Sequence, residues 1–151
     1  MHKRLIPLAL ACVGDENPIE GRTRLQKMVF VIQQELSQTE DYSEDRFYEY
    51  FAYDYGPFSK ELAEDIDEMI DADLLIENEV EYNDEGDLKY LYRVDDSGRE
   101  VAEKQRDDDD AQAIIELAKS VKQRYNEQMS LPEVIDEVYE EYPEYAENSV
   151  Y

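Results

Sequence analysis

The residue types that most often carry catalysis are scarce in this chain. Its 151 residues include one histidine, His2, and one cysteine, Cys12. Ser-His-Asp triads, Cys-His pairs and His-rich zinc sites draw on these types, so we expect none of them within a single chain. One cysteine also excludes an internal disulfide framework. The sequence contains no glycine-rich loop of the kind that cradles phosphate groups.

Carboxylates, by contrast, are abundant. Asp and Glu number 40 against 15 Lys and Arg, so the closeness of two carboxylates has almost no diagnostic value. The run from Asp107 to Asp110 lacks the alternating ligands, central glycine and closing glutamate of an EF-hand calcium loop. We expect a solvated turn there that caps the following helix. The sequence therefore predicts no catalytic residue, no cofactor, no metal site and no enzyme.

Basic side chains gather in two places. Arg22, Arg24 and Lys27 form a basic spot within residues 1–36, which carry a net charge of +1, whereas the whole chain carries −25. They are candidates for binding an anion or an acidic segment of a partner protein; the alternative is that they pair with neighbouring acids. The second group, on the penultimate expected helix, supplies the candidate DNA contacts Lys119, Lys122 and Arg124.

A tyrosine-rich segment follows the first basic spot. Aromatic residues alternate along residues 47–53, as they do in a strand. Tyrosine supplies a large contact area and a hydrogen bond at low entropic cost, so this segment is a candidate partner surface. Its tyrosines are Tyr48, Tyr50, Tyr53 and Tyr55. The alternative is that their rings fill the core.

Composition places the chain among folded proteins of a particular kind. Apolar residues make up 42% of it, which is too much buryable surface for a disordered chain and enough for one domain, residues 1–151. The acidic excess, with few lysines and no tryptophan, is typical of proteins from salt-in halophiles. We therefore expect a protein that unfolds when salt is diluted.

The N-terminus holds a short apolar run, residues 5–13. A lipoprotein signal also has such a run before a cysteine, but Ala9 stands three residues before Cys12, where a bulky aliphatic residue is usual. We instead expect a helix that buries Leu5, Leu8, Ala9 and Cys12 on one face and leaves Lys3 and Arg4 in solvent. No stretch approaches the ~18 apolar residues that span a bilayer, so we expect a cytoplasmic protein.

Hydrophobic spacing and capping residues predict the other elements. Helices are expected from Thr23 with a Thr-x-x-Gln box, from Ser59, from Ser97, after the turn at 107–110, and from Ser130 until Pro143. Strands are expected over 47–53, stopped by Tyr55-Gly56-Pro57, and over 74–82 and 88–94, joined as a hairpin. This order predicts an α+β, mostly helical fold. Its winged-helix-like core, about 1–95, has three helices, a β-hairpin wing and an extra aromatic strand, and helices are appended over about 96–151.

Two motifs carry a family resemblance. Residues 21–30, with Leu25-Gln26-Lys27, and residues 55–59, Tyr-Gly-Pro-Phe-Ser, precede an acidic amphipathic helix; together they resemble the YwgA-like proteins and the wider SocA/Panacea group. The ending from Leu131-Pro132-Glu133 to Asn148-Ser149 is also similar, although the interval between the motifs is filled differently. The resemblance implies a mostly helical regulator with winged-helix-like parts. For the Panacea group it implies an antitoxin that contacts a toxin or a proteolysis partner, and it implies no agreed enzymatic activity.

The charge of the expected elements distinguishes between the two kinds of partner, DNA and protein, that a winged-helix-like core suggests. Residues 60–73, the expected groove-reading helix, hold one Lys and seven acids, and residues 76–94, the expected wing, hold six acids and two basic residues. Such surfaces repel a phosphate backbone. We therefore expect a non-enzymatic protein-interaction or regulatory module. The alternative is a homodimeric DNA-binding regulator that uses Lys119, Lys122 and Arg124 or the basic spot.

Overall fold

The computed structural model describes residues 3–14, 17–38, 47–81, 83–105 and 108–147. Within them the fold is α+β and mainly helical, as predicted, with two small antiparallel sheets. The helices are α1 (Leu5–Cys12), α2 (Arg22–Leu36), α3 (Lys60–Asp71), α4 (Asp96–Lys104), α5 (Asp109–Lys122) and α6 (Leu131–Glu141), with a π-helix at Gln123–Glu127 and a 3-10 helix at Pro143–Ala146. The strands are β1 (Ile19–Glu20), β2 (Phe51–Tyr53), β3 (Gly56–Phe58), β4 (Leu75–Glu81) and β5 (Leu88–Val94).

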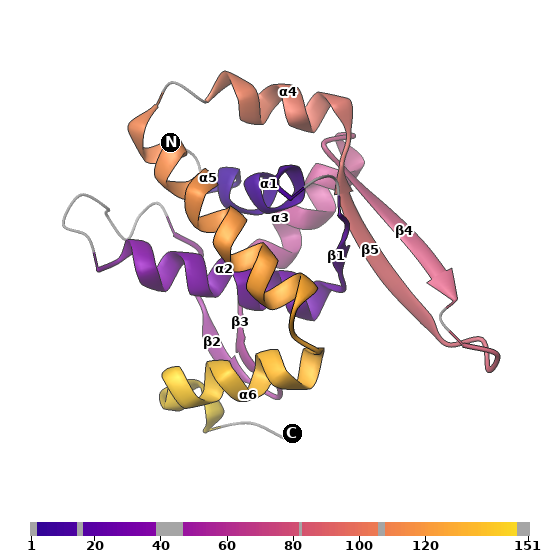
Figure 1. The fold of residues 1–151 in the computed structure, drawn as a ribbon, viewed down its shortest axis with the longest axis vertical. Coiled ribbons are helices and arrows are strands. Elements are labelled where there is room, and N and C mark those ends of the chain that lie inside the picture. The colour runs from indigo at the N-terminus through magenta and orange to yellow at the C-terminus, as the bar shows by residue number, and fades with distance from the viewer. Residues whose placement is uncertain (1–2, 15–16, 39–46, 82, 106–107, 148–151) are drawn as a thin grey trace.

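Helix α1 is buried on all sides. Its residues Leu5–Ala11 are all buried, because the sequence offers no polar face. Helices α4 and α5 pack around it (Figure 1). The prediction of a single buried face is therefore wrong. The two basic residues before α1, expected in solvent, instead form ion pairs with acids of α3: Lys3 with Glu61, and Arg4 with Asp65 and Glu68.

Helix α2 runs through the centre of the core, and eleven of its fifteen residues are buried. The capping box predicted at Thr23 does not form. The helix begins at Arg22 after Gly21, which has a φ of +102° and no side-chain cap. Gln26, the expected partner of Thr23, hydrogen-bonds with Ser59 instead, and glycine readily adopts the positive φ that starts the helix.

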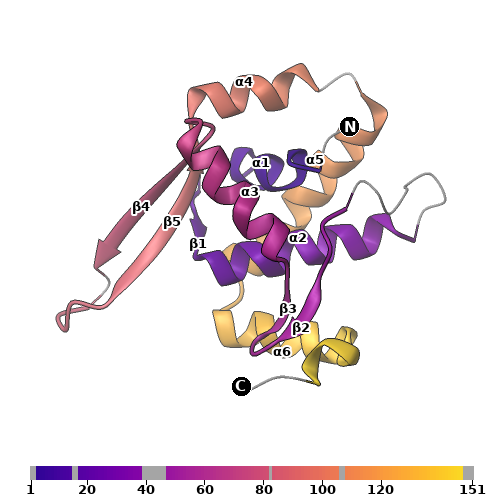
Figure 2. The same ribbon diagram turned by 180° about the vertical axis from the view of Figure 1, so that it is seen from behind.

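The three-stranded sheet has the order β1-β5-β4, and all its pairs are antiparallel. The predicted hairpin is confirmed as β4–β5, with Glu77 opposite Tyr92 and Glu81 opposite Leu88. Strand β1 was not predicted; its two residues pair with Leu91 and Tyr92. Most of the β4–β5 hairpin projects away from the helices, as both ribbon views show (Figures 1 and 2).

The tyrosine-rich segment forms a second hairpin rather than one strand. Only Phe51–Tyr53 of the predicted 47–53 strand is extended in a sheet, and Gly56–Phe58 returns antiparallel to it. The predicted stop is therefore a strand, which tolerates Pro57 because a two-stranded sheet has only edge strands. Gly56 has a φ of +98°, as expected for a glycine that redirects the chain.

The C-terminal helices start and end largely as predicted. Ser130 and Glu133 form the expected capping box of α6, which ends just before Pro143, and Asp108 caps α5. Helix α4, however, is capped by Asp95 rather than Ser97. Gly98 lies in the first turn of this helix and packs closely on Leu74: a Cβ at Gly98 would lie 2.1 Å from the carbonyl oxygen of Leu74.

None of the helices in the described residues combines the length and the apolar character that crossing a bilayer requires.

Candidate functional site

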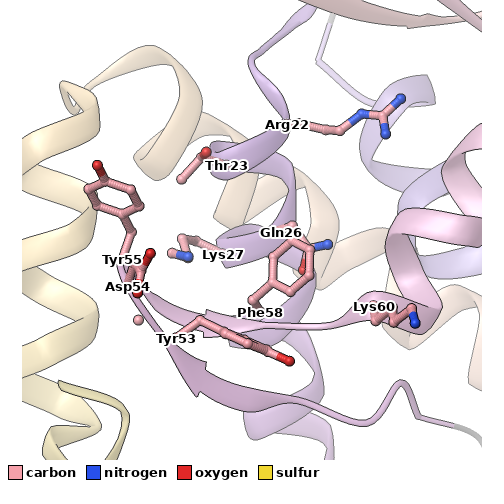
Figure 3. Close-up of a pocket in the computed structure, with 10 residues that line it drawn as sticks. Arg22, Thr23, Gln26, Lys27, Tyr53, Asp54, Tyr55, Phe58 and Lys60 are labelled. Carbon is pink, nitrogen blue, oxygen red and sulfur yellow. The ribbon is translucent and has the colours of Figure 1, made fainter. Parts of the chain in front are cut away.

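Four residues that the sequence singles out line one pocket: Arg22, Lys27, Tyr53 and Tyr55. The pocket has a volume of about 400 Å³ and lies between the first turns of α2 and the β2–β3 hairpin. Figure 3 shows Lys27 of α2 between Tyr55 and Phe58 of the hairpin, while the charged ends of Arg22 and Lys60 point away from these rings. The fold thus places one part of the basic spot beside one part of the tyrosine-rich segment.

Buried polar contacts fasten the hairpin to α2. The side-chain amide of Gln26 donates to the carbonyl of Ser59 and accepts from its N–H, both at 2.9 Å. Lys27 Nζ donates to the carbonyl of Pro57 at 2.9 Å, and the Tyr50 hydroxyl donates to the carbonyl of Gln26 at 2.8 Å. Gln26 and Lys27 are therefore buried and do not face solvent, although both side chains are polar. Their side chains instead join the two motifs on which the family resemblance is based.

Gly56 sets how closely the hairpin approaches α6. A Cβ at this position would lie 2.8 Å from Cε1 of Tyr139, a distance that real Cβ atoms avoid. Only glycine combines this close approach with the positive φ. The pocket is consequently bounded on one side by a hairpin whose position α2 and α6 both fix.

Lys27 is a buried cation at the pocket. Its residue is 3% exposed, and no carboxylate of the described residues forms an ion pair with it. Burial lowers the pKa of Lys27 to about 8. Because desolvation disfavours a charge that has no counter-ion, Lys27 is the group in this pocket whose environment is least satisfied.

Arg22, in contrast, is already neutralised. Its Nη2 lies 2.7 Å from Asp67 Oδ1 and 3.1 Å from Glu77 Oε2, and its Nε donates to the Tyr92 hydroxyl at 3.0 Å. Burial alone would lower the pKa of Arg22, but the hydrogen bonds to Asp67 and Tyr92 raise it. The alternative that basic residues pair with nearby acids is thus correct for Arg22.

The outer face of the hairpin is aromatic and open. Phe51, Tyr53 and Tyr55 are 48%, 48% and 51% exposed. Tyr53 makes edge contacts with the rings of Phe51, at 6.4 Å between centroids, and Phe58, at 5.4 Å. These contacts form a small aromatic patch continuous with the pocket wall.

Tyr48 and Tyr50 face inward instead. Tyr48 is 3% exposed, and its hydroxyl donates to Asp65 at 2.8 Å; burial and this bond raise the pKa of Tyr48. The Tyr50 ring packs edge-on against Phe30. Their placement on an exposed surface is therefore wrong, and the alternative that tyrosine rings fill the core holds for both.

Arg24 also serves the interior. It is 7% exposed and donates to the carbonyls of Tyr125 and Met129, at 2.5 and 2.7 Å. Burial lowers the pKa of Arg24. These contacts tie the first turn of α2 to one carbonyl within the π-helix and one just after it. Arg24 is consequently a buried structural residue and not part of an open basic surface.

The three candidate DNA contacts do not form one surface. Lys122 is 1% exposed, and its Nζ donates to the carbonyl of Val13 at 2.7 Å. Arg124 forms an ion pair with Glu137. Lys119 is exposed and lines a separate cavity beside Cys12.

Sequence reasoning missed Asp54, Phe58 and Lys60 as pocket residues. A signal for Asp54 and Phe58 exists in residues 51–58, where an Asp-Tyr pair and a glycine separate Phe51-Ala52-Tyr53 from Phe58. That pattern is compatible with a tight hairpin, which would have placed Phe58 opposite Phe51. The strand prediction failed because the glycine and proline were interpreted only as an end signal.

Comparison with known proteins does not identify this site. Within the described residues, no cluster of three or more His, Cys, Asp or Glu side chains could hold a metal ion. The site is thus a pocket with an aromatic rim and a buried lysine. No protein-family model matches the chain, and no curated protein matches it at a significant level.

Proposed function

We propose that this chain is a non-enzymatic protein-interaction or regulatory module of a halophilic cytoplasm, antitoxin-like or adaptor-like, that docks a partner protein on the β2–β3 hairpin. The observation that carries the proposal is the half-exposed aromatic patch of Phe51, Tyr53 and Tyr55. Large aromatic side chains are the residues that most often dominate binding energy at protein interfaces. Their exposure on one short hairpin therefore favours a docking role.

The proposal includes a winged-helix-like core. It is supported by the order helix α1, strand β1, helices α2 and α3 and hairpin β4–β5, with the β2–β3 hairpin inserted between α2 and α3, and by the sheet order β1-β5-β4. Membership of the YwgA-like or SocA/Panacea group is part of the same proposal. It is supported by the contacts of Gln26 and Lys27 with Ser59 and Pro57, which give both motifs a shared structural role.

Charge supports a protein partner over DNA. The exposed side of α3 carries Glu61, Glu64, Asp67, Glu68 and Asp71. Molar salt would shorten the screening length to about 3 Å and so weaken their repulsion of phosphate, but it would also remove the counterion-release gain that drives DNA binding. The aromatic patch depends little on either effect.

The test is partner recovery by matched variants in molar KCl. Tagged wild type, Tyr53→Ala and Tyr90→Ala would be used as baits in lysate of the source cells, and recovered proteins quantified. Tyr90 is the control because it is also an exposed tyrosine, 41%, but lies on the β4–β5 hairpin. We expect a partner that wild type and Tyr90→Ala retain and Tyr53→Ala loses at least about tenfold. Equal recovery by all three would refute docking at the patch.

A DNA-binding regulator is the second candidate, and the core arrangement just described is the observation that favours it. Such a protein would act as a homodimer on two half-sites. A gel shift with the upstream region of its own gene, across salt concentrations, tests it. The candidate fails if no sequence-dependent shift occurs at any salt concentration.

A further inference from the structure

We propose that the pocket between α2 and the β2–β3 hairpin binds a small organic acid with one carboxylate on an aromatic or branched apolar body. This goes beyond the proposed function, because it needs no partner protein and concerns the cavity that Tyr53 and Tyr55 of the aromatic patch also line. The proposal stands on the buried Lys27, the aromatic walls and the placement of charge around the cavity.

Lys27 is an incompletely satisfied cation. The Lys27 ammonium has three N–H donors, and the described residues supply one acceptor, the carbonyl of Pro57 at 2.9 Å. Lys122, the other buried lysine, also donates to one carbonyl, but Glu127 lies close enough to favour its charged form. Lys27 has no such carboxylate and borders a cavity. An anion bound there would supply the missing counter-charge to an ammonium group whose residue is itself buried.

The walls of the pocket are largely aromatic. Tyr53 and Phe58 meet edge to face, and Tyr55 lines the pocket on the other side of Lys27 in the view of Figure 3. A volume of about 400 Å³ lies at the lower end of the range for small-molecule sites. The cavity therefore suits one ring or one branched aliphatic group next to the charged head.

The charges around the cavity favour a ligand with a single negative charge. Arg22 already carries two carboxylate partners, and Asp54 adds its own negative charge to the lining. Lys60 stands at the edge and is exposed. A phosphate dianion would meet Asp54 with only Lys27 and Lys60 to balance it. A monocarboxylate fits this arrangement better.

The pocket is also held in place before any ligand arrives. Gln26 pairs with both backbone groups of Ser59, and Gly56 packs directly on Tyr139. Binding would consequently order little additional chain, so a small acid can bind without a large conformational cost.

The test compares phenylacetate with phenylacetamide by titration calorimetry on the whole chain in molar KCl. The two probes share shape and differ in charge. Surface attraction by Lys60 is screened at this salt, whereas the buried Lys27 is screened much less. We expect phenylacetate to bind at least about tenfold more tightly than the amide. Equal affinities, or no binding of phenylacetate at millimolar concentration, would overturn the proposal.

Variants assign the effect to Lys27. Lys27→Met should reduce phenylacetate affinity to that of the amide and leave the amide unchanged, whereas the exposed control Lys104→Met should change neither. Tyr53→Ala should weaken the binding of both probes alike, because it removes an aromatic side chain that lines the pocket and no charge. A loss in Lys104→Met equal to that in Lys27→Met overturns the assignment. Thermal melting checks folding, and if Lys27→Met does not fold, the acid-to-amide contrast in the wild type decides.

A titration with a peptide distinguishes a small free acid from the C-terminus of a polypeptide as the ligand. A short peptide that ends in phenylalanine with a free carboxylate would be titrated beside phenylacetate. Similar or weaker binding of the peptide supports the small-acid assignment. Binding of the peptide more than about tenfold tighter would overturn it in favour of a polypeptide C-terminus. Because no partner is present, either result is independent of partner recovery at the aromatic patch.

Discussion

The two hairpins of this molecule are held in opposite ways. The β2–β3 hairpin has strands of three residues, yet Gln26, Lys27 and Tyr50 attach it to α2 through buried hydrogen bonds. The β4–β5 hairpin has strands of seven residues and projects from the body with Leu88 and Tyr90 exposed (Figure 2). The number of ladder hydrogen bonds therefore does not decide which hairpin is fixed in position. Buried side-chain contacts to a neighbouring helix decide it.

Arg22 connects the two regions. It lines the pocket and at the same time donates to Tyr92 and pairs with Glu77 at the base of the β4–β5 hairpin. The Tyr92 hydroxyl in turn donates to Glu77 at 2.6 Å. Only the base of the long hairpin is tied down in this way, so substitutions should be costly at β2–β3 and at that base but cheap along the projecting strands.

The largest effect should come from the clamp on Ser59. Gln26→Leu leaves the buried N–H of Ser59 without a partner and removes one of the two donors to the Ser59 carbonyl, which keeps the N–H of Ala63. We expect a loss of about 2–4 kcal/mol in the free energy of unfolding. Urea denaturation followed by circular dichroism measures it. Gln34→Leu, the same change on the same helix at a half-buried position, is the control and should cost far less. Equal losses in the two variants would show that the clamp does not hold the hairpin.

Two glycines with positive φ allow a direct comparison of the hairpins. Gly56→Ala meets Tyr139 at 2.8 Å, whereas nothing lies within 4 Å of a Cβ at Gly86, at the turn of the β4–β5 hairpin. Both variants lose the backbone freedom of glycine, about 1 kcal/mol, and Gly56→Ala adds a steric cost, for a total of about 2 kcal/mol. Thermal melting of both checks this. Identical shifts in melting temperature would mean that the contact with α6 yields at no cost.

Because two lysines are buried, we expect the free energy of unfolding to rise with pH. Burial lowers the pKa of Lys27 and of Lys122 to about 8, below the usual 10.5. Between about pH 8 and pH 10.5 the unfolded chain therefore binds more protons than the folded chain. The free energy of unfolding increases as the pH rises through that window. We expect about 1 kcal/mol per lysine between about pH 7.5 and about pH 9, below the range where tyrosines ionise.

Variants sharpen the pH prediction. Lys27→Met should remove about half of the rise, because Lys122 supplies the other half. Lys89→Met, which removes a lysine paired with Glu20 at the surface of the β4–β5 hairpin, should keep the full rise. Urea midpoints at a series of pH values measure these slopes. A slope in Lys27→Met as steep as in the wild type would place the titrating group elsewhere.

The parts of the fold that sequence predicted are those set by local pattern. The β4–β5 hairpin has alternating strands and a polar turn, and Ser130 with Glu133 forms a cap within four residues, so both were found. The two-residue strand β1 carries no such pattern and exists because Ile19 and Glu20 pair with a distant strand. Likewise Thr23 lost its cap because Gln26 has a better partner 33 residues away.

Only part of the candidate site was predicted from the sequence, because only the residue types and their proximity along the chain are local properties. Residue type and sequence proximity brought Arg22, Lys27, Tyr53 and Tyr55 into consideration, and they line one pocket. Burial, which sequence did not supply, then separated Tyr48 and Arg24 from them. Tyr48 lies against Asp65 of α3, and Arg24 binds carbonyls 101 and 105 residues later. Long-range tertiary contacts of this kind leave no periodic signal in the chain.

The smallest expected effect concerns the projecting strands. Tyr90→Thr keeps a residue that favours strands at an exposed position opposite Glu79, so we expect a change below about 0.5 kcal/mol in the free energy of unfolding. Urea denaturation of the purified chain at low and high protein concentration measures it. A loss above 1 kcal/mol that grows with protein concentration would show that this strand packs against another molecule, and the long hairpin would then be fixed from outside.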